Sequence, residues 1–246
     1  MMGKQGTWRQ SIASLAISAL ILLTFRWVIF EPYVIPSGSM LPTLKILDFI
    51  YVNKFSYGLR LPFSSKWVFE RDLPKRCDVV VFRSPTEPGI FLIKRVMGLP
   101  GEHVELFQSG RVRIDGRLLE TTPVALKDDA RKDGDTEHLR FREDCGGGRT
   151  HLIQVAPALA ADAEDAVDPL IYSIQVPSDH LILFGDNRHE SADSRVWGSV
   201  SRTELLGEAL GIWLSCESAL PGLPRLCDPS TLRTERIFTR LDREER

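Results

Sequence analysis

The sequence predicts a mainly β protein: an antiparallel β-sheet domain with a β-rich insertion, carried on a single N-terminal transmembrane helix. Three observations predict this class. Short β-branched runs recur between turns rich in glycine and proline, helical periodicity is weak after residue 31, and residues 11–30 form a nearly continuous apolar segment. A chain of 246 residues is long enough for one large domain or two small ones.

The apolar segment 11–30 has the length and composition of a membrane anchor. Fifteen of its twenty residues are apolar and its one charge is Arg26. Twenty helical residues span roughly 30 Å, the thickness of a bilayer core. A cleaved signal peptide would need small residues after the apolar core, which residues 25–30 lack. A buried core helix would need a polar face, so we expect an uncleaved transmembrane helix.

Charges before this segment predict its orientation. Lys4 and Arg9 precede it without an acidic residue, and positive charges favour the cytoplasmic side. We therefore expect residues 1–10 in the cytoplasm and a single pass through the cell (inner or plasma) membrane. Everything after residue 31 is then extracytoplasmic.

Beyond the anchor, alternating or β-branched patterns bounded by turn residues predict a series of strands. These strands cover residues 48–53, 78–82, 91–97, 170–176, 180–184 and 207–215. The pairs Ser109-Gly110 and Asp115-Gly116 predict hairpin turns, the second of type I′. We interpret residues 54–76 as a long surface connection.

The middle of the chain is strongly charged. Residues 127–144 carry twelve charged side chains of eighteen, and three glycines follow at 146–148. Such a segment buries little apolar surface, so we interpret 127–150 as a mobile, solvated excursion. For 156–169 a short helix and a further loop both stay open. The domain boundaries that we expect are a main β domain over 31–105 and 176–246, with an inserted β-rich or loop region at 106–175.

Charge and cysteine content narrow the function classes. With 31 basic and 33 acidic side chains the net charge is −2, so no basic field indicates nucleic-acid binding. Four cysteines allow three pairings, and Cys216 and Cys227, which flank a loop rich in proline and glycine, are the most plausible pair. Cys77 and Cys145 have no CxxC partners, so we expect no structural zinc, and we expect no other metal or cofactor.

Residues 36–44 (PSGSMLPTL) form a constrained loop with two hydroxyls, Ser37 and Ser39. Two prolines fix φ there, and Gly38 lets the chain pass close to another group. A serine held on such a loop is a candidate nucleophile because its Oγ can be aimed. The alternative is a linker rich in serine and proline between the anchor and the domain.

Lys94 lies within the apolar strand 91–97. Burying an ammonium is costly unless it is paired or loses its proton, so Lys94 is a candidate base. The alternative is ordinary: Lys94 and Arg95 alternate faces, so one would be exposed and the other a salt-bridged rim residue. A third polar stretch, residues 185–198 (GDNRHESADSRVWG), indicates a loop, and Arg188 stands where a calcium-binding loop needs an oxygen ligand.

Taken together, these stretches resemble the bacterial type I signal peptidase (leader peptidase) family of Ser/Lys membrane proteases. The similar segments are PSGSMLPTL, DFIYVNKFSYG, KRVMGLPGE and GDNRHESADSRVWG, in the family's order and after an anchor. The resemblance extends from about residue 26 to 101 and from about 181 to 215. Residues 120–175 match no such motif.

The resemblance implies a role for each matching residue. Ser39 would be the nucleophile and Lys94 its general base, whose pKa must then fall from about 10.4 towards neutrality. The Ser39 N–H and Ser37 Oγ would form the oxyanion hole, and Ser191 would orient the lysine amine. Supporting roles fall to Gly185, which lets backbone approach the site, and to a salt bridge between Asp193 and Arg195. Apolar pockets that accept alanine at the first and third positions before the cut would be lined by Ile35, Met40, Leu44 and Ile93.

Two departures from the family's pattern stand out. Cys77 replaces a usual glycine, and His189-Glu190 replaces a usual Asp-Asn pair. His189 also raises a rival catalytic triad of Ser39, His189 and Asp193, which would leave Lys94 unexplained.

The expected function is a membrane-bound serine endopeptidase that removes N-terminal signal peptides from exported preproteins after Ala-x-Ala-type sites. Its expected partners are preprotein signal peptides and membrane lipid, without nucleic acid. A specialised Ser/Lys maturation peptidase of a conjugation or secretion system is one alternative. A non-catalytic, membrane-anchored β binding module is another, and it predicts no reaction with serine-directed probes. The substrate repertoire and the oligomeric state stay open.

Overall fold

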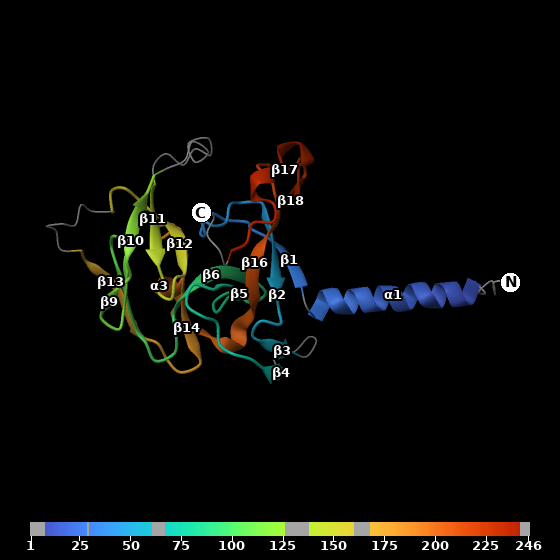
Figure 1. Cartoon of the computed structure of the whole chain (residues 1–246), viewed down its shortest axis with the longest axis horizontal. Helices are drawn as coiled ribbons and strands as arrows, with labels where there is room; N and C mark the ends of the chain where they lie inside the picture. Colours follow the sequence, from blue (N-terminus) through green and yellow to red (C-terminus); the bar gives the residue numbers. More distant parts are fainter. Residues whose placement is uncertain (1–7, 29, 61–66, 126–137, 160–167, 242–246) are drawn as a thin grey trace.

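The computed structural model describes residues 8–28, 30–60, 67–125, 138–159 and 168–241. The described chain is mainly β, with antiparallel pairing between all its named strands, as predicted. Figure 1 shows the strands gathered in one body from which the long helix α1 projects. The predicted division into a main domain and an insertion stays a prediction.

A seven-stranded sheet forms the centre of the body, in the order β1-β2-β16-β5-β6-β14-β15. Its strands are β1 (Phe30–Val34), β2 (Asp48–Asn53), β16 (Leu205–Ser215), β5 (Val79–Arg83), β6 (Phe91–Gly98), β14 (His180–Phe184) and β15 (Val200–Ser201). The predicted strands 48–53 and 180–184 are confirmed with identical bounds. Those predicted at 78–82, 91–97 and 207–215 are confirmed to within two residues at each end.

Strand β5 explains how this sheet makes its core. Val79 and Val81 pack into one hydrophobic cluster, and Val80 and Phe82 pack into another. Because side chains alternate between the two faces of a strand, both faces of β5 are covered. This coverage accounts for the continuous apolar run in the sequence.

Two smaller sheets lie beside the central one. One has the order β13-β7-β8-β9, from β13 (Leu170–Gln175), β7 (His103–Phe107), β8 (Val112–Ile114) and β9 (Arg117–Leu118). The other has the order β10-β11-β12, from β10 (Thr121–Val124), β11 (Leu139–Asp144) and β12 (Thr150–Val155). The hairpin turn between β8 and β9 has positive φ at Asp115 (48°) and Gly116 (79°), which confirms the predicted type I′ turn.

One interpretation of a connecting segment was wrong, and another was incomplete. The end of the supposed solvated excursion forms β11 and the start of β12, because Glu143 and Cys145 are buried there rather than solvated. The supposed surface connection 54–76 contains a hairpin of β3 (Gly58–Arg60) and β4 (Trp67–Glu70). Residues 126–137 and 160–167, which hold the rest of the excursion and most of 156–169, lie outside the described part.

Helix α1 (Trp8–Val28) covers most of the predicted anchor. Its described apolar side chains are exposed, with Trp8, Leu15 and Leu20 at 70%, 72% and 65%. Within the described residues, no helix combines the length and apolar content that crossing a membrane requires. The helix is therefore confirmed, and its transmembrane character stays a prediction.

One of the two disulfides closes a local hairpin, and the other links distant parts of the chain. Cys216 pairs with Cys227 as predicted, around β17 (Ala219–Leu220) and β18 (Leu223–Cys227). Cys77 pairs with Cys145, a pairing that the sequence left open. The C-terminal part is completed by the short helices η2 (Pro229–Thr231) and η3 (Thr234–Arg236), while α3 (Ser194–Trp197) and η1 (Arg202–Glu204) lie between β14 and β16.

Candidate active site

The loop between β1 and β2 holds Ser39. Its ends are closed by backbone hydrogen bonds between Ile35 and Asp48 (2.9 Å) and between Leu47 and Ile35 (3.0 Å). Met40, on one side of the serine, is fully buried in the core cluster that includes Val79 and Val81. Because Met40 is buried directly beside Ser39, it fixes the position of the serine relative to the sheet.

Lys94 meets this loop from β6. Its side chain is 3% exposed, and its Nζ donates to Ser39 Oγ at 2.7 Å and to the carbonyl oxygen of Ile93 at 3.0 Å. Arg95, on the opposite face of the strand, is 2% exposed. The ordinary interpretation of this pair as surface residues is therefore wrong, because both cations are buried.

Burial lowers the pKa of Lys94 to about 8. The nearby carboxylates of Asp193 and Asp186 act in the opposite direction, and Arg195 adds to the lowering. Loss of solvation exceeds the attraction of these carboxylates, since an apolar site disfavours the ammonium form. An amine with this pKa is neutral in a large share of molecules near pH 8, so it can accept a proton from a hydroxyl in contact with it.

The loop after β14 contacts the backbone of the nucleophile loop at Gly38 and Ser39. The Asn187 backbone N–H donates to the carbonyl oxygen of Ser39 at 3.2 Å, and the Asn187 side chain donates to that of Gly38 at 3.2 Å. A Cβ atom at Gly185 would lie 2.5 Å from the Ser39 carbonyl oxygen and 2.2 Å from Ser191 Oγ. Only glycine leaves room for this approach.

The predicted salt bridge between Asp193 and Arg195 is confirmed. Arg195 Nε and Nη2 donate to the two carboxylate oxygens of Asp193, each at 2.7 Å. Asp193 also accepts from the Gly185 N–H at 3.0 Å. The ion pair therefore holds the backbone of Gly185, which lies against Ser39, in place.

Ser191 differs from its expected contact. Its buried Oγ has no hydrogen-bond partner among the described residues, so the expected bond to the Lys94 amine is not formed in this structure. It lies next to Gly185 instead. Ser37 is exposed on the nucleophile loop. The roles of both hydroxyls stay predictions.

The four predicted pocket residues gather in one place, largely out of solvent. Ile35, Met40 and Leu44 are 2%, 0% and 0% exposed, and Ile93 is a partly buried neighbour of their cluster. Only Ile93 therefore offers side-chain surface to a substrate in this structure. Their part in lining a pocket stays a prediction.

Comparison with known proteins decides the family. The family model described as "Signal peptidase, peptidase S26" matches residues 8–214. The chain belongs to this family. It is 37% identical over 205 residues to a signal peptidase I of Pseudomonas aeruginosa, covering 79% of this chain and 68% of that one. It is 38% identical over 220 residues to a signal peptidase I of Pseudomonas fluorescens, covering 83% of this chain and 72% of that one.

One solved structure is also similar. A signal peptidase I of Enterococcus faecalis V583 covers 56% of this chain and 97% of its own, at 24% identity and a TM-score of 0.34. The family assignment itself rests on the two sequence comparisons.

The structure contradicts the rival catalytic triad of Ser39, His189 and Asp193. His189 Nδ1 accepts from the backbone N–H of Ala156 at 3.0 Å, and Nε2 lies 2.8 Å from the carbonyl oxygen of Gln108. Both ring nitrogens are therefore occupied by backbone, and Asp193 is paired with Arg195. His189 instead joins β12 and the turn after β7 to the loop after β14.

A buried ion pair beside the Ser/Lys contact was missed by the sequence analysis. Arg95 Nε and Nη2 donate to the Asp186 carboxylate at 2.7 and 2.6 Å, and both side chains are almost fully buried. Thr43 Oγ1, on the nucleophile loop, donates to the same carboxylate. The one signal in the sequence was the doubled cation at Lys94-Arg95, because two adjacent cations in an apolar strand cannot both face water.

Proposed function

We propose that this protein is a serine endopeptidase that removes N-terminal signal peptides from exported preproteins, with Ser39 as nucleophile and Lys94 as general base. The observation that carries the proposal is the 2.7 Å contact between Lys94 Nζ and Ser39 Oγ, made by a buried lysine whose pKa is lowered to about 8. Membership of the signal peptidase S26 family supports the reaction class.

The proposed reaction follows from this contact. Neutral Lys94 takes the Ser39 hydroxyl proton while Oγ attacks the scissile carbonyl carbon, forming a tetrahedral intermediate. The resulting ammonium gives the proton to the leaving amine, so the peptide bond breaks and an acyl-enzyme forms. Water, activated by the same amine, then hydrolyses the ester and restores Ser39.

The developing oxyanion needs donors close to Ser39. We assign this role to the Ser39 N–H and to Ser37 Oγ, which lies two residues earlier on the same loop. We assign Ser191, whose buried Oγ is free of hydrogen bonds, to orient the amine once substrate is bound. A buried hydroxyl without a partner is costly, which supports a role that is completed during the reaction.

Substrate selection would depend on the apolar side chains beside the nucleophile loop. Small apolar pockets beside Ile93, with Ile35, Met40 and Leu44 behind it, would accept alanine and reject bulk at the first and third positions before the cut. The relatives named above are signal peptidases I, which supports signal peptides as the substrate class.

We also propose that the N-terminal segment anchors the enzyme in the cell membrane, with residues 1–10 in the cytoplasm. The apolar run 11–30 and the basic residues Lys4 and Arg9 support this arrangement. The exposed apolar side chains of α1 need a lipid or protein partner, since water disfavours them.

A single experiment tests the proposed reaction. Detergent-solubilised protein is incubated with a preprotein whose signal peptide ends Ala-x-Ala, and the new N-terminus is sequenced. Cleavage directly after the second alanine supports the proposal, and an intact preprotein contradicts it. Cleavage of several unrelated preproteins separates a general enzyme from a specialised maturation peptidase, which would accept few. A non-catalytic binding module would leave every substrate intact.

A further inference from the structure

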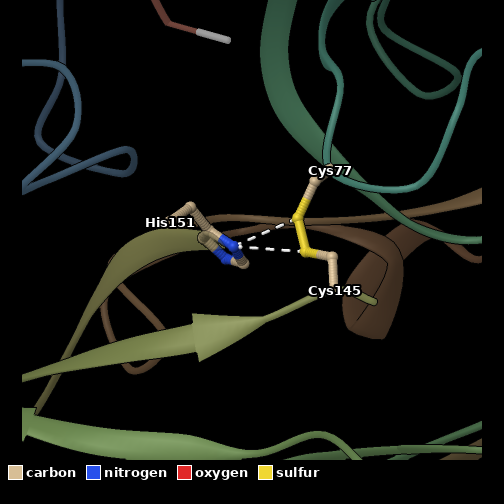
Figure 2. Close-up of side chains that lie close together, drawn as sticks. All are labelled: Cys77, Cys145 and His151. Atoms are coloured by element: carbon tan, nitrogen blue, oxygen red, sulfur yellow. Dashed lines mark hydrogen bonds between the residues drawn. A yellow bond between two sulfur atoms is a disulfide. The ribbon is translucent and has the colours of Figure 1, made fainter. Parts of the chain in front are cut away.

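The disulfide between Cys77 and Cys145 joins the central sheet to the β10–β12 sheet across 68 residues. Cys77 lies just before β5, and Cys145 follows β11. Figure 2 shows His151, from β12, pointing its ring at both sulfurs, with Nδ1 3.2 Å from Cys77 Sγ and 3.3 Å from Cys145 Sγ. All three side chains are buried, with exposures of 4%, 8% and 4%.

The backbone of Cys77 indicates that its side chain has a specific task. Its φ is +73°, in the left-handed region that is unfavourable for an L-residue and costs glycine little. A non-glycine residue persists in such a conformation when the surrounding structure requires it. Here the requirement is the link to Cys145.

The far side of the His151 ring faces carboxylates. Its Nε2 lies 3.3 Å from Glu143 Oε2 and 3.8 Å from Asp186 Oδ1, although neither contact is aligned as a hydrogen bond. Burial and the nearby Arg95 lower the pKa of His151, while Glu143 and Asp186 act in the opposite direction. A disulfide sulfur carries no hydrogen, so the ring Nδ1–H is the donor in the hydrogen bonds to the two sulfurs.

Asp186 carries this contact to the nucleophile loop. It binds Arg95 and accepts from Thr43 Oγ1, and the residue after it donates its N–H to the Ser39 carbonyl oxygen. Arg95 Nη1 also donates to the carbonyl oxygen of Cys77 at 2.8 Å. Cys77 therefore holds the Arg95 end of the pair by a hydrogen bond, and the His151 ring lies 3.8 Å from the Asp186 end.

We propose that the Cys77–Cys145 disulfide and His151 form a positioning unit that holds Asp186, and through it the Ser39 loop, so that the oxidation state of this cysteine pair sets catalytic efficiency. The proposal rests on the proposed Ser39/Lys94 function. In the oxidised state the hairpin β11–β12 is covalently fixed, and His151 is held between the sulfurs and the carboxylates. Reduction by a dithiol transfers two electrons and two protons to the pair, yields two thiols and a cyclic disulfide of the reagent, and releases the hairpin.

The same three side chains suggest a competing use. Two thiolates and an imidazole nitrogen are a suitable donor set for a thiophilic ion such as Zn²⁺. The sulfurs are bonded to each other in this structure, so they cannot act as ligands without prior reduction. Metal binding by the reduced chain is therefore an outcome to be tested against the positioning unit.

The test compares two disulfide deletions in the full chain. Cys77→Gly with Cys145→Ala removes the positioning disulfide while glycine keeps the left-handed backbone, and Cys216→Ala with Cys227→Ala removes the other disulfide as a matched control. Both are assayed for cleavage of one Ala-x-Ala peptide, well below their melting temperatures. A 1 Å misplacement near the reacting atoms can cost up to about a hundredfold, so we expect kcat to fall roughly 5- to 100-fold in the first variant, with KM nearly unchanged. The control should keep wild-type kcat.

Equal kcat in the two variants overturns the proposal, since the disulfide would then act on stability alone. An inactive wild type would instead contradict the proposed function. His151→Leu should lower kcat in the same way, whereas His151→Gln, which can still donate a hydrogen bond, should recover part of the loss. Equal kcat for these two variants contradicts the role of His151.

A reversible version of the test leaves Cys77, Cys145 and His151 unsubstituted. In the Cys216→Ala/Cys227→Ala background only one disulfide remains, so dithiothreitol should lower kcat and its removal in air should restore kcat. The reduced sample is assayed with EDTA and with Zn²⁺. Continued low activity in both supports the disulfide unit, and full recovery with Zn²⁺ alone assigns the cluster to a metal and overturns the proposal.

Discussion

Lys94 Nζ lies 2.7 Å from Ser39 Oγ although the two residues are 55 positions apart and β16 and β5 lie between β2 and β6 in the sheet. The loop that carries Ser39 therefore crosses one face of the sheet instead of following its edge. Met40 and Leu44 of this loop pack in the same cluster as Val79 and Val81 of β5, which fixes that path. The sheet acts as a fixed support on which a hydroxyl from one strand connection meets an amine from a distant strand.

We predict that Ser39→Ala and Lys94→Ala each abolish cleavage, with loss of at least about 10³-fold in kcat, because one hydroxyl and one amine perform the chemistry. Lys94→Arg should fail too, since a guanidinium does not lose its proton at working pH. Peptide cleavage is measured alongside circular dichroism. Ser230→Ala and Lys75→Ala, at exposed positions, are the matched controls and should be fully active. Full activity in a correctly folded Ser39→Ala or Lys94→Ala variant would refute the mechanism.

We predict that kcat/KM rises with pH through about 8, the pKa to which burial lowers Lys94. The direction follows from the role: below this pH the ammonium has no lone pair, and above it the neutral amine can accept the serine proton. The measurement is a pH profile of kcat/KM on one soluble Ala-x-Ala peptide. His189→Ala should keep the same profile, since both nitrogens of His189 bind backbone. A rise centred near 6.5 that disappears in His189→Ala would contradict the lysine assignment.

We predict that Lys94→Met, although inactive, is more stable than the wild type at pH 7, by at most about 3 kcal/mol. The pKa of this lysine falls from 10.5 to about 8 on folding. Between these values the unfolded chain binds a proton that the folded chain does not, so wild-type stability rises with pH across that window. Below it, the folded protein carries the full penalty of a buried ammonium.

The stability difference should therefore be largest at pH 7 and should shrink as the pH rises from 8 towards 10.5. Urea unfolding of both proteins at pH 7, 8.5 and 9.5 checks this. Lys75→Met, at an exposed position, should show no such trend. A Lys94→Met variant that is less stable than the wild type at every pH would count against a penalty at Lys94.

We predict that Gly185→Ala lowers kcat by up to about a hundredfold, because displacing reacting groups by about 1 Å has a cost of this order. The added Cβ would lie 2.5 Å from the Ser39 carbonyl oxygen, so the nucleophile loop must move. Gly148→Ala is a useful comparison, since nothing lies within 4 Å of its added Cβ and any effect there comes from its positive φ. It should change the melting temperature but leave kcat near the wild-type value. Similar kcat in the two variants would show that the Gly185 approach is not required.

We predict that protease added to intact spheroplasts digests the part of the chain after residue 31, because Lys4 and Arg9 favour a cytoplasmic N-terminus. Immunoblotting of an N-terminal and a C-terminal epitope measures it. A cytoplasmic marker protein must stay intact in the same sample. Digestion only after the membrane is broken would reverse the topology.

The strands were predictable where a local pattern reflects burial. Residues 48–53 alternate between buried and half-buried. In the sequence, the half-buried aromatic residues Phe49 and Tyr51 alternate with the buried β-branched residues Ile50 and Val52. The contact between Ser39 and Lys94 was predictable only from the resemblance to a known family. Nothing in the local pattern brings residues 55 positions apart together.

The rest depends on partners that are distant in the chain. Glu143 lies in a charged segment, so its sequence context predicts that it is solvated. It is fully buried, because Arg188, 45 positions later, forms a bidentate ion pair with it. Cys77 and Cys145 carry no spacing signal, because their proximity is created by two separate sheets. Charge alone therefore predicts exposure wrongly wherever a buried counter-charge comes from another element.

Strand β16 joins the two halves of the central sheet, although it is the last strand of that sheet along the chain. It forms after almost all of the other strands have been synthesised, yet it pairs with β2 on one side and β5 on the other. A nascent chain that ends before Leu205 has its serine and its lysine but lacks the strand that bridges their two halves of the sheet. We therefore expect a chain shortened in this way to lack the Ser39–Lys94 contact and to be inactive.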